Sequence, residues 1–163
     1  MRRIATLPVA AVLVLAGCGD DGESGPAAPP TEAAPQAQPE PKQKPAGTEI
    51  RVAGSEFGPM LFDARKQAIY VFENDARNKS VCYGECAEAW PPVYTEGEPR
   101  AADGARQSLL GTAERRDGRR QVTYAGKPLY YYAHEGPGEV RCHDVNLNGG
   151  FWWVVGPGGK RRP

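Results

Sequence analysis

The chain has 163 residues and carries 20 lysine and arginine side chains against 20 aspartate and glutamate side chains, so its formal net charge at pH 7 is zero. This balance excludes nucleic acid as the main partner, because nucleic-acid-binding domains carry a basic patch or stripe. The length suits one folded domain, and no apolar stretch approaches the roughly 20 residues that a membrane-spanning helix needs.

The N-terminus has the pattern of an export signal. Two arginines precede a run of thirteen mostly apolar residues, 4–16, which is too short to cross a bilayer but suits a signal peptide. The run closes on Leu15-Ala16-Gly17-Cys18, which has the form of a bacterial lipobox. We predict that residues 1–17 are a lipoprotein signal peptide and that Cys18 becomes the lipid anchor, acylated with chains such as palmitate. The alternative is an ordinary secretory signal in which Cys18 is incidental.

Acylation would fix the location of the mature protein. A diacylglyceryl group with an added N-acyl chain is enough for stable anchoring in a bilayer. We therefore expect the protein at the cell membrane, lipid-anchored, on the extracytoplasmic face. Disulfides persist in that compartment. The mature chain loses Arg2 and Arg3, and its formal charge is then 18 minus 20, or −2.

The lipidated cysteine opens a tether, residues 18–47. From residue 19 to residue 47 there is no aromatic residue and no Ile, Leu, Val or Met, and seven prolines interrupt the segment. Such a composition cannot bury enough apolar surface to fold, so we expect a disordered, partly polyproline-II spacer. At about 3.1 Å per residue the spacer reaches at most roughly 90 Å from the lipid surface.

All 14 aromatic residues lie after Thr48, so the folded domain is expected over residues 48–163. Short runs of β-branched and aromatic residues alternate there with turn signals, which predicts a mainly β, compact antiparallel domain. One short helix is expected at 85–90, where Pro91 and Pro92 end it. The predicted strands cover residues 50–52, 60–62, 68–72, 109–114, 121–124, 128–132 and 151–155.

Two turns punctuate the second half of this domain. Asp117-Gly118 is a strong hairpin signal, and Ala125-Gly126-Lys127 predicts a second tight turn. Basic side chains surround the first turn, and we expect them to be exposed at a hairpin tip, where they discourage edge-to-edge pairing. The alternative is contact with anionic lipid headgroups or wall polymers. The cluster consists of Arg115, Arg116, Arg119 and Arg120.

A shift of about 60 residues superimposes two halves of the domain, about 48–105 and 106–163. The pattern of tyrosine, any residue, aromatic, two variable residues and acid occurs in each half. The same shift places Cys82 on Cys142. The domain should therefore consist of two related halves. The repeat-motif residues are Tyr70, Phe72 and Asp75 in the first half and Tyr130, Tyr132 and Glu135 in the second.

In a strand, residues two apart share a face, so the two aromatic residues of each motif point the same way. We expect these faces to pack in the core and each acid to accept hydrogen bonds from the backbone of the following loop. The alternative is an exposed platform of paired aromatics for a ligand. The expected core consists of Met60, Phe62, Ile69, Tyr70, Phe72, Trp90, Leu129, Tyr130, Tyr132, Trp152 and Val154.

These features together resemble one family, the bacterial secreted-repeat lipoproteins named for their Yx(FWY)xxD motif. The resemblance rests on the lipobox, the two motifs, the segment from Cys82 to Pro92 and the segment from Gly149 to Val155. It covers nearly all of residues 48–163. The family has no established activity, so the resemblance implies a location and an architecture. The second motif departs from the family pattern, because it ends in Glu135 instead of aspartate.

Three cysteines remain beside the anchor, and an odd number cannot all pair within one chain. One interpretation is a structural disulfide between Cys82 and Cys86, closed by a distorted turn at Gly84. A second is a bridge from Cys142 to either of them, which would close a loop of about 60 residues and stabilise the fold by roughly 4 kcal/mol. A third is a metal site of Cys82, Cys86 and His143, a set that suits Cu(I) or zinc.

Two functions from different classes remain open. The first is a non-enzymatic envelope or cell-surface module that binds an envelope protein or a wall component, with no cofactor. The second is a redox or copper-handling protein that uses Cys82, Cys86 and His143. We expect no enzyme, because the sequence offers no nucleophile and base that can be paired by motif.

Overall fold

The computed structural model describes residues 45–163. The predicted signal peptide, the lipid anchor Cys18 and the tether up to residue 44 lie outside the described residues. Within 45–163, no helix is both long enough and apolar enough to span a membrane. The described part is mostly strands, in three sheets of three strands each with one α-helix, which confirms the predicted mainly β class.

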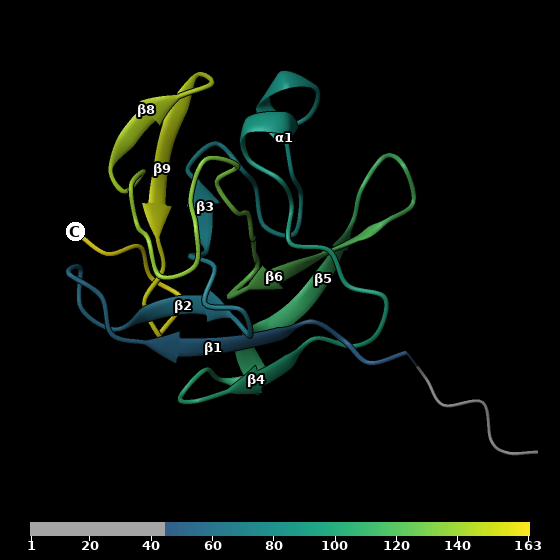
Figure 1. The fold of residues 1–163 in the computed structure, drawn as a ribbon. Coiled ribbons are helices and arrows are strands. Elements are labelled where there is room, and N and C mark those ends of the chain that lie inside the picture. The colour runs from purple at the N-terminus through teal and green to yellow at the C-terminus, as the bar shows by residue number, and fades with distance from the viewer. Residues whose placement is uncertain (1–44) are drawn as a thin grey trace, which may run out of the picture. The chain divides into compact units, whose positions relative to one another are not determined.

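The three sheets are built from short strands (Figure 1). The first sheet has the order β2-β1-β4, the second β3-β9-β8 and the third β5-β6-β7. All paired strands are antiparallel except β1 and β4, which are parallel. The strands are β1 (Glu49–Ala53), β2 (Met60–Asp63), β3 (Tyr70–Phe72), β4 (Arg100–Ala102), β5 (Leu110–Glu114), β6 (Arg120–Tyr124), β7 (Lys127–Pro128), β8 (Val145–Leu147) and β9 (Gly150–Val154).

The helices are short. The helix α1 spans Glu85–Ala89, as predicted, and a 3-10 turn spans Gln107–Leu109. The predicted strand at 128–132 is wrong as a continuous element. It is reduced to β7 and two isolated bridges at Tyr130, with Tyr70 and with Pro92, because Tyr130 bonds to other segments instead of extending the β6–β7 ladder.

The same local unit occurs in both halves of the domain. A hairpin, β1–β2 or β5–β6, is followed by a turn back onto its second strand. In the first half Ile69 N donates to Leu61 O at 3.2 Å, and in the second half Leu129 N donates to Val122 O at 3.0 Å. The equivalence of these bonds confirms two related halves.

The halves exchange strand segments. The strand β9, from the second half, pairs with β3 of the first half, which Figure 1 shows side by side. In return, Pro92 from the first half forms a bridge with Tyr130 of the second, and Tyr131 N donates to Pro91 O at 2.8 Å. Each half therefore completes the sheet structure of the other.

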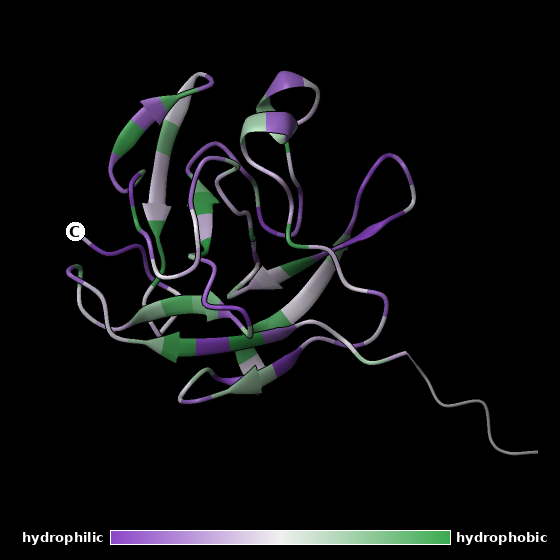
Figure 2. Ribbon diagram, viewed as in Figure 1, coloured by the Kyte–Doolittle hydropathy of each residue, from purple (hydrophilic) through white to green (hydrophobic). Residues whose placement is uncertain are grey.

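The motif segment is buried on both faces. Tyr70 and Phe72 enter one apolar cluster, whereas Ile69 and Val71 enter a second cluster on the opposite face, as the two-residue period requires. Of the expected core residues all are buried except Tyr132, which is half-buried and packs against the first cluster. In Figure 2 the apolar residues concentrate along the strands, and the tip between β5 and β6 is hydrophilic.

The β8–β9 hairpin was not expected in full, because only residues 151–155 were predicted as a strand. Its turn is Asn148-Gly149, with φ angles of 56° and 86°. Two consecutive positive φ values define the type I′ turn that joins two antiparallel strands tightly, and Asn-Gly is its strongest sequence signal.

Candidate functional site

The two repeat motifs meet inside the domain. Tyr70 and Tyr130 form an antiparallel bridge, in which Tyr70 N donates to Tyr130 O at 2.8 Å and Tyr130 N donates to Tyr70 O at 3.0 Å. Both side chains are fully buried. Tyr70 and Tyr130 therefore belong to the core, and an exposed ligand platform made of these two residues is excluded by the structure.

The first tyrosine of each motif donates its hydroxyl to the acid of the other repeat. Tyr70 donates to Glu135 Oε1 at 2.6 Å, and Tyr130 donates to Asp75 Oδ2 at 2.7 Å. The two bonds are buried and related by the repeat shift. This crossed pairing was not predicted from the sequence, and it gives the fixed spacing between tyrosine and acid a physical reason.

The acids also hold the loops that follow them, as predicted. Asp75 Oδ1 accepts a hydrogen bond from Val81 N at 2.8 Å. Glu135 Oε1 accepts from Arg141 N and, at 3.2 Å, from Cys142 N. Glu135 thus fulfils the role of aspartate despite its longer side chain. Its second oxygen, Oε2, is buried and has no partner among the described residues.

Burial shifts the pKa values of the paired acids and tyrosines. Desolvation raises the pKa of Asp75 and of Glu135 above their ordinary values, although the tyrosine and backbone hydrogen bonds oppose the shift. Burial also raises the pKa of Tyr70 and of Tyr130, with the facing carboxylates as further causes. The tyrosines therefore remain protonated donors at any physiological pH.

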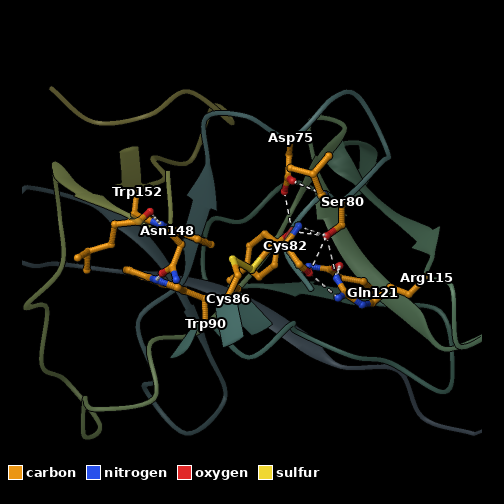
Figure 3. Close-up of a disulfide and its surroundings, with 12 residues drawn as sticks. Asp75, Ser80, Cys82, Cys86, Trp90, Arg115, Gln121, Asn148 and Trp152 are labelled. Atoms are coloured by element: carbon orange, nitrogen blue, oxygen red, sulfur yellow. Dashed lines mark hydrogen bonds between the residues drawn. A yellow bond between two sulfur atoms is a disulfide. The ribbon is translucent and has the colours of Figure 1, made fainter. Parts of the chain in front are cut away.

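Arg115 is buried, with 4 % of its surface exposed, so the prediction that it lies exposed at the hairpin tip is wrong. Its guanidinium donates to Ser80 Oγ at 2.8 Å, to Gln121 Oε1 at 2.8 Å and to Cys82 O at 2.7 Å (Figure 3). The guanidinium thus bonds three acceptors inside the fold, two of which, Ser80 Oγ and Cys82 O, have further hydrogen-bond partners. Gln121, itself fully buried, also donates to Leu129 O at 2.8 Å.

This cluster extends the first motif. The Ser80 and Tyr130 hydroxyl oxygens lie 2.7 Å apart, so hydrogen bonds connect Arg115 through Ser80 to Tyr130 and Asp75. The second motif has no equivalent, because Val140 occupies the position that matches Ser80.

The other arginines of the turn between β5 and β6 fit the predicted exposure better. Arg116 and Arg119 are exposed, and Arg120 is half-buried.

Cys82 and Cys86 form a disulfide, with their Cα atoms 5.3 Å apart (Figure 3). The separation lies within the usual range. Cys82 lies before α1, and Cys86 lies within it. Gly84, with a φ angle of 56°, turns the chain between the two cysteines, as the predicted distorted turn requires. Cys142 is buried and unpaired, so the alternative bridge from Cys142 is wrong.

The predicted alternative metal set is not assembled. Within residues 45–163, no three His, Cys, Asp or Glu side chains are grouped to hold a metal ion. Cys82 and Cys86 are joined to each other, and the His143 ring packs on Phe57 and Trp153, with centroids 4.3 Å and 5.7 Å away. The copper site of Cys82, Cys86 and His143 is therefore wrong for this structure. A redox role for the disulfide stays a prediction.

A family model described as a secreted repeat of unknown function matches the chain twice, over residues 52–94 and 111–156. The chain belongs to this family of secreted repeats. Neither a curated protein nor a solved structure matches it. As a member of a secreted family, the protein works outside the cytoplasm, in the envelope or beyond it.

The two matched segments contain both partners of each internal exchange. The first includes Tyr70 and Trp90, and the second includes Tyr130 and Trp152. In this secreted-repeat protein the two copies are therefore interlocked rather than arranged as separate modules. Ser80 and Arg115 were missed as structural residues, because no local pattern marks a polar side chain whose partners lie in another repeat. Gln121 was missed although its partners, Arg115 and Leu129, lie in its own repeat.

Proposed function

We propose that this secreted-repeat protein is a lipid-anchored lipoprotein on the extracytoplasmic face of the cell membrane, where it acts as a non-enzymatic binding module of the envelope. The lipobox ending at Cys18, placed directly after a short apolar run, supports the anchor. The secreted character of the family supports the compartment.

The crossed pairing of Tyr70 with Glu135 and of Tyr130 with Asp75 carries the proposed binding role. The hydroxyls of Tyr70 and Tyr130 and at least one oxygen of each acid are engaged with one another, and hydrogen-bonded networks of this kind make a core rigid and unique. A rigid core of this kind is suited to presenting side chains on loops and outer sheet faces to a partner. The ligand contacts are accordingly assigned to the surface rather than to the motifs.

The partner is proposed to be a component of the envelope, either a wall polymer or another envelope protein. The Pro-rich tether between Cys18 and the domain supports this choice. Its length, about 90 Å when extended, would let an anchored domain reach material beyond the headgroups. Nucleic acid is not proposed, because the mature chain has a formal charge of 18 minus 20, or −2.

Two measurements test the proposal. Cys18→Ser should move the protein from the membrane fraction to the soluble extracytoplasmic fraction and abolish incorporation of labelled palmitate. The mature-length chain carrying Cys18→Ser should co-sediment with cell-wall sacculi of the producing bacterium, and not with particles of a neutral polysaccharide. Retention of the Cys18→Ser protein in the membrane would contradict the anchor, and absence of binding to sacculi and to envelope extracts would contradict the module.

A further inference from the structure

A small pocket opens where the outer face of β9 meets the C-terminal segment. It has a volume of about 220 Å³, and Val71, Glu73, Lys127, Trp153 and Arg161 contribute to its lining. The C-terminal segment is held there by a bridge between Val155 and Arg161, and Figure 1 shows it beside β9. We refer to this cavity as the Trp153 pocket.

Half-buried aromatic rings extend from the pocket across the surface. The Trp153 ring lies 5.9 Å from Phe151 and 5.7 Å from His143, measured between centroids. His143 in turn lies 4.3 Å from Phe57, in the β1–β2 hairpin. We call Phe57, His143, Phe151 and Trp153 the aromatic strip. All four residues are half-buried, so each keeps part of its surface exposed.

The pocket also carries charges of both signs. The Arg161 guanidinium lies 4.7 Å from the Trp153 ring centroid, and Lys127 Nζ donates to Asp75 O at 3.1 Å. Neither cation forms an ion pair within residues 45–163. Glu73 is exposed and accepts from Phe151 N at 2.8 Å through Oε1. Trp153 Nε1 is shielded from solvent and has no acceptor in the described part of the chain.

We propose that the Trp153 pocket and the aromatic strip bind an acidic envelope glycan. A sugar ring packs on Trp153, its carboxylate or phosphate pairs with Lys127 and Arg161, and its hydroxyls donate to Glu73. Aromatic faces offer rigid apolar area, arginine pairs well with carboxylate and phosphate, and an ionised carboxylate only accepts hydrogen bonds. The inference rests on the proposed binding function and names its site and its ligand class.

The mixed charge favours a glycan over a lipid surface. A bilayer of anionic headgroups attracts a uniform basic surface, whereas Glu73 inside the pocket would repel it. A neutral sugar has no anionic group that could pair with Lys127 or Arg161. A ligand that combines hydroxyls with an anionic group uses Lys127, Arg161 and Glu73 together.

The test measures binding of the mature-length chain, carrying Cys18→Ser, to cell-wall sacculi of the producing bacterium. Trp153→Ala should weaken binding about tenfold, and Arg161→Glu by a similar factor, because each removes a central contact. Trp153→Phe should retain most of the affinity. Arg119→Ala is the matched control, since Arg119 lies 4.0 Å over the Tyr94 ring in a similar contact at another surface. Thermal unfolding of each variant verifies that it is folded.

Three further measurements decide whether the anionic group is a carboxylate or a phosphate, whether this site is the one that binds, and whether the ligand is a glycan or a lipid surface. Sacculi stripped of phosphodiester-linked polymers keep their carboxylates, so retained binding assigns the carboxylate and lost binding assigns the phosphate. Both results support an acidic glycan. Binding of wild type that Trp153→Ala and Arg161→Glu leave unchanged overturns this site while the envelope function stands. Binding to phosphatidylglycerol vesicles but not to sacculi, with loss in the same variants, overturns the glycan in favour of a lipid surface.

Discussion

Trp90 and Trp152 stack face to face in the core, with ring centroids 3.8 Å apart and ring planes within 2° of parallel, although they belong to different repeats (Figure 3). Each ring meets the tyrosine of its own repeat edge-on, at 5.3 Å for Tyr70 and 5.2 Å for Tyr130. The four rings form a buried centre with matching contacts on both sides. The two repeats are joined there by apolar contact as well as by hydrogen bonds.

Trp90→Ala and Trp152→Ala should each lower the free energy of unfolding by about 3–5 kcal/mol, because each leaves a large cavity. The double variant should lose less than the sum, since the two rings share one contact. Denaturant unfolding followed by circular dichroism measures both quantities. Trp153→Ala, next in the same strand but half-buried, is the control and should lose clearly less. Additive losses would show that the stack does not couple the repeats.

Stability should fall as the pH rises from acid toward neutral because of the two motif acids. Burial raises the folded-state pKa of Asp75 above its ordinary value of 3.8, and that of Glu135 above 4.5. The folded state therefore holds protons that the unfolded state has released, so the contribution is present below the unfolded values and is lost as the pH rises through the raised values.

Unfolding midpoints measured from pH 3 upward test this dependence. Asp75→Asn removes one titrating group and should flatten the curve in that window, although it weakens the Tyr130 bond. Glu88→Gln, at an exposed position on α1, is the control and should leave the curve unchanged. A wild-type stability that rises steadily with pH across this window would contradict the sign.

The sequence was enough to predict the class of fold, the two halves, the helix at 85–90 and the burial of Tyr70 and Tyr130. These features depend on local composition or on a repeat spacing that can be seen directly. The loop-capping role of Asp75 is also local, because its backbone partner lies only six residues away. The pairing of Cys82 with Cys86 was open among three interpretations, and it is the closest pair along the chain.

The exchange between the repeats could not be predicted, because a shift of 60 residues is equally compatible with two separate halves. The partners of Tyr70 lie 65 residues away at Glu135, and no local pattern selects one acid over the other. Arg115 was missed for a related reason: arginine beside a turn is usually exposed, and two of its three acceptors, on Ser80 and Cys82, come from the other repeat. The Asn148-Gly149 turn signal can be seen in the sequence. The strand before it, β8, was not predicted, because none of its residues is buried.

Replacing Arg115 with Ala should lower the free energy of unfolding by about 3 kcal/mol. The change leaves Gln121 Oε1 buried without this donor and leaves Cys82 O with only the 3.4 Å bond from Ser80 Oγ. The loss of a buried partner costs more than the hydrogen bond itself. Chemical unfolding measures the difference. Arg119→Ala is the matched control within the same turn and should change stability by less than about 0.5 kcal/mol, because Arg119 is exposed. Equal effects of the two substitutions would contradict the buried role of Arg115.

Neither repeat should fold without the other. When residues 45–105 and 106–163 are produced as separate chains, each lacks the segment that completes its sheet: β9 for the first repeat, and the strand-like segment at Pro91 and Pro92 for the second. Each fragment alone should be unfolded by near-ultraviolet circular dichroism. The equimolar mixture should regain the aromatic signal, because the two chains can re-form the contacts of Trp90 with Trp152.

The control for this reassembly is the second fragment, residues 106–163, carrying Trp152→Ala, which should reassemble with the first fragment far more weakly. A fragment that folds as a stable monomer by itself would show that the exchange is an incidental feature of the connected chain, and the crossed pairs of Tyr70 with Glu135 and of Tyr130 with Asp75 would then be dispensable for folding.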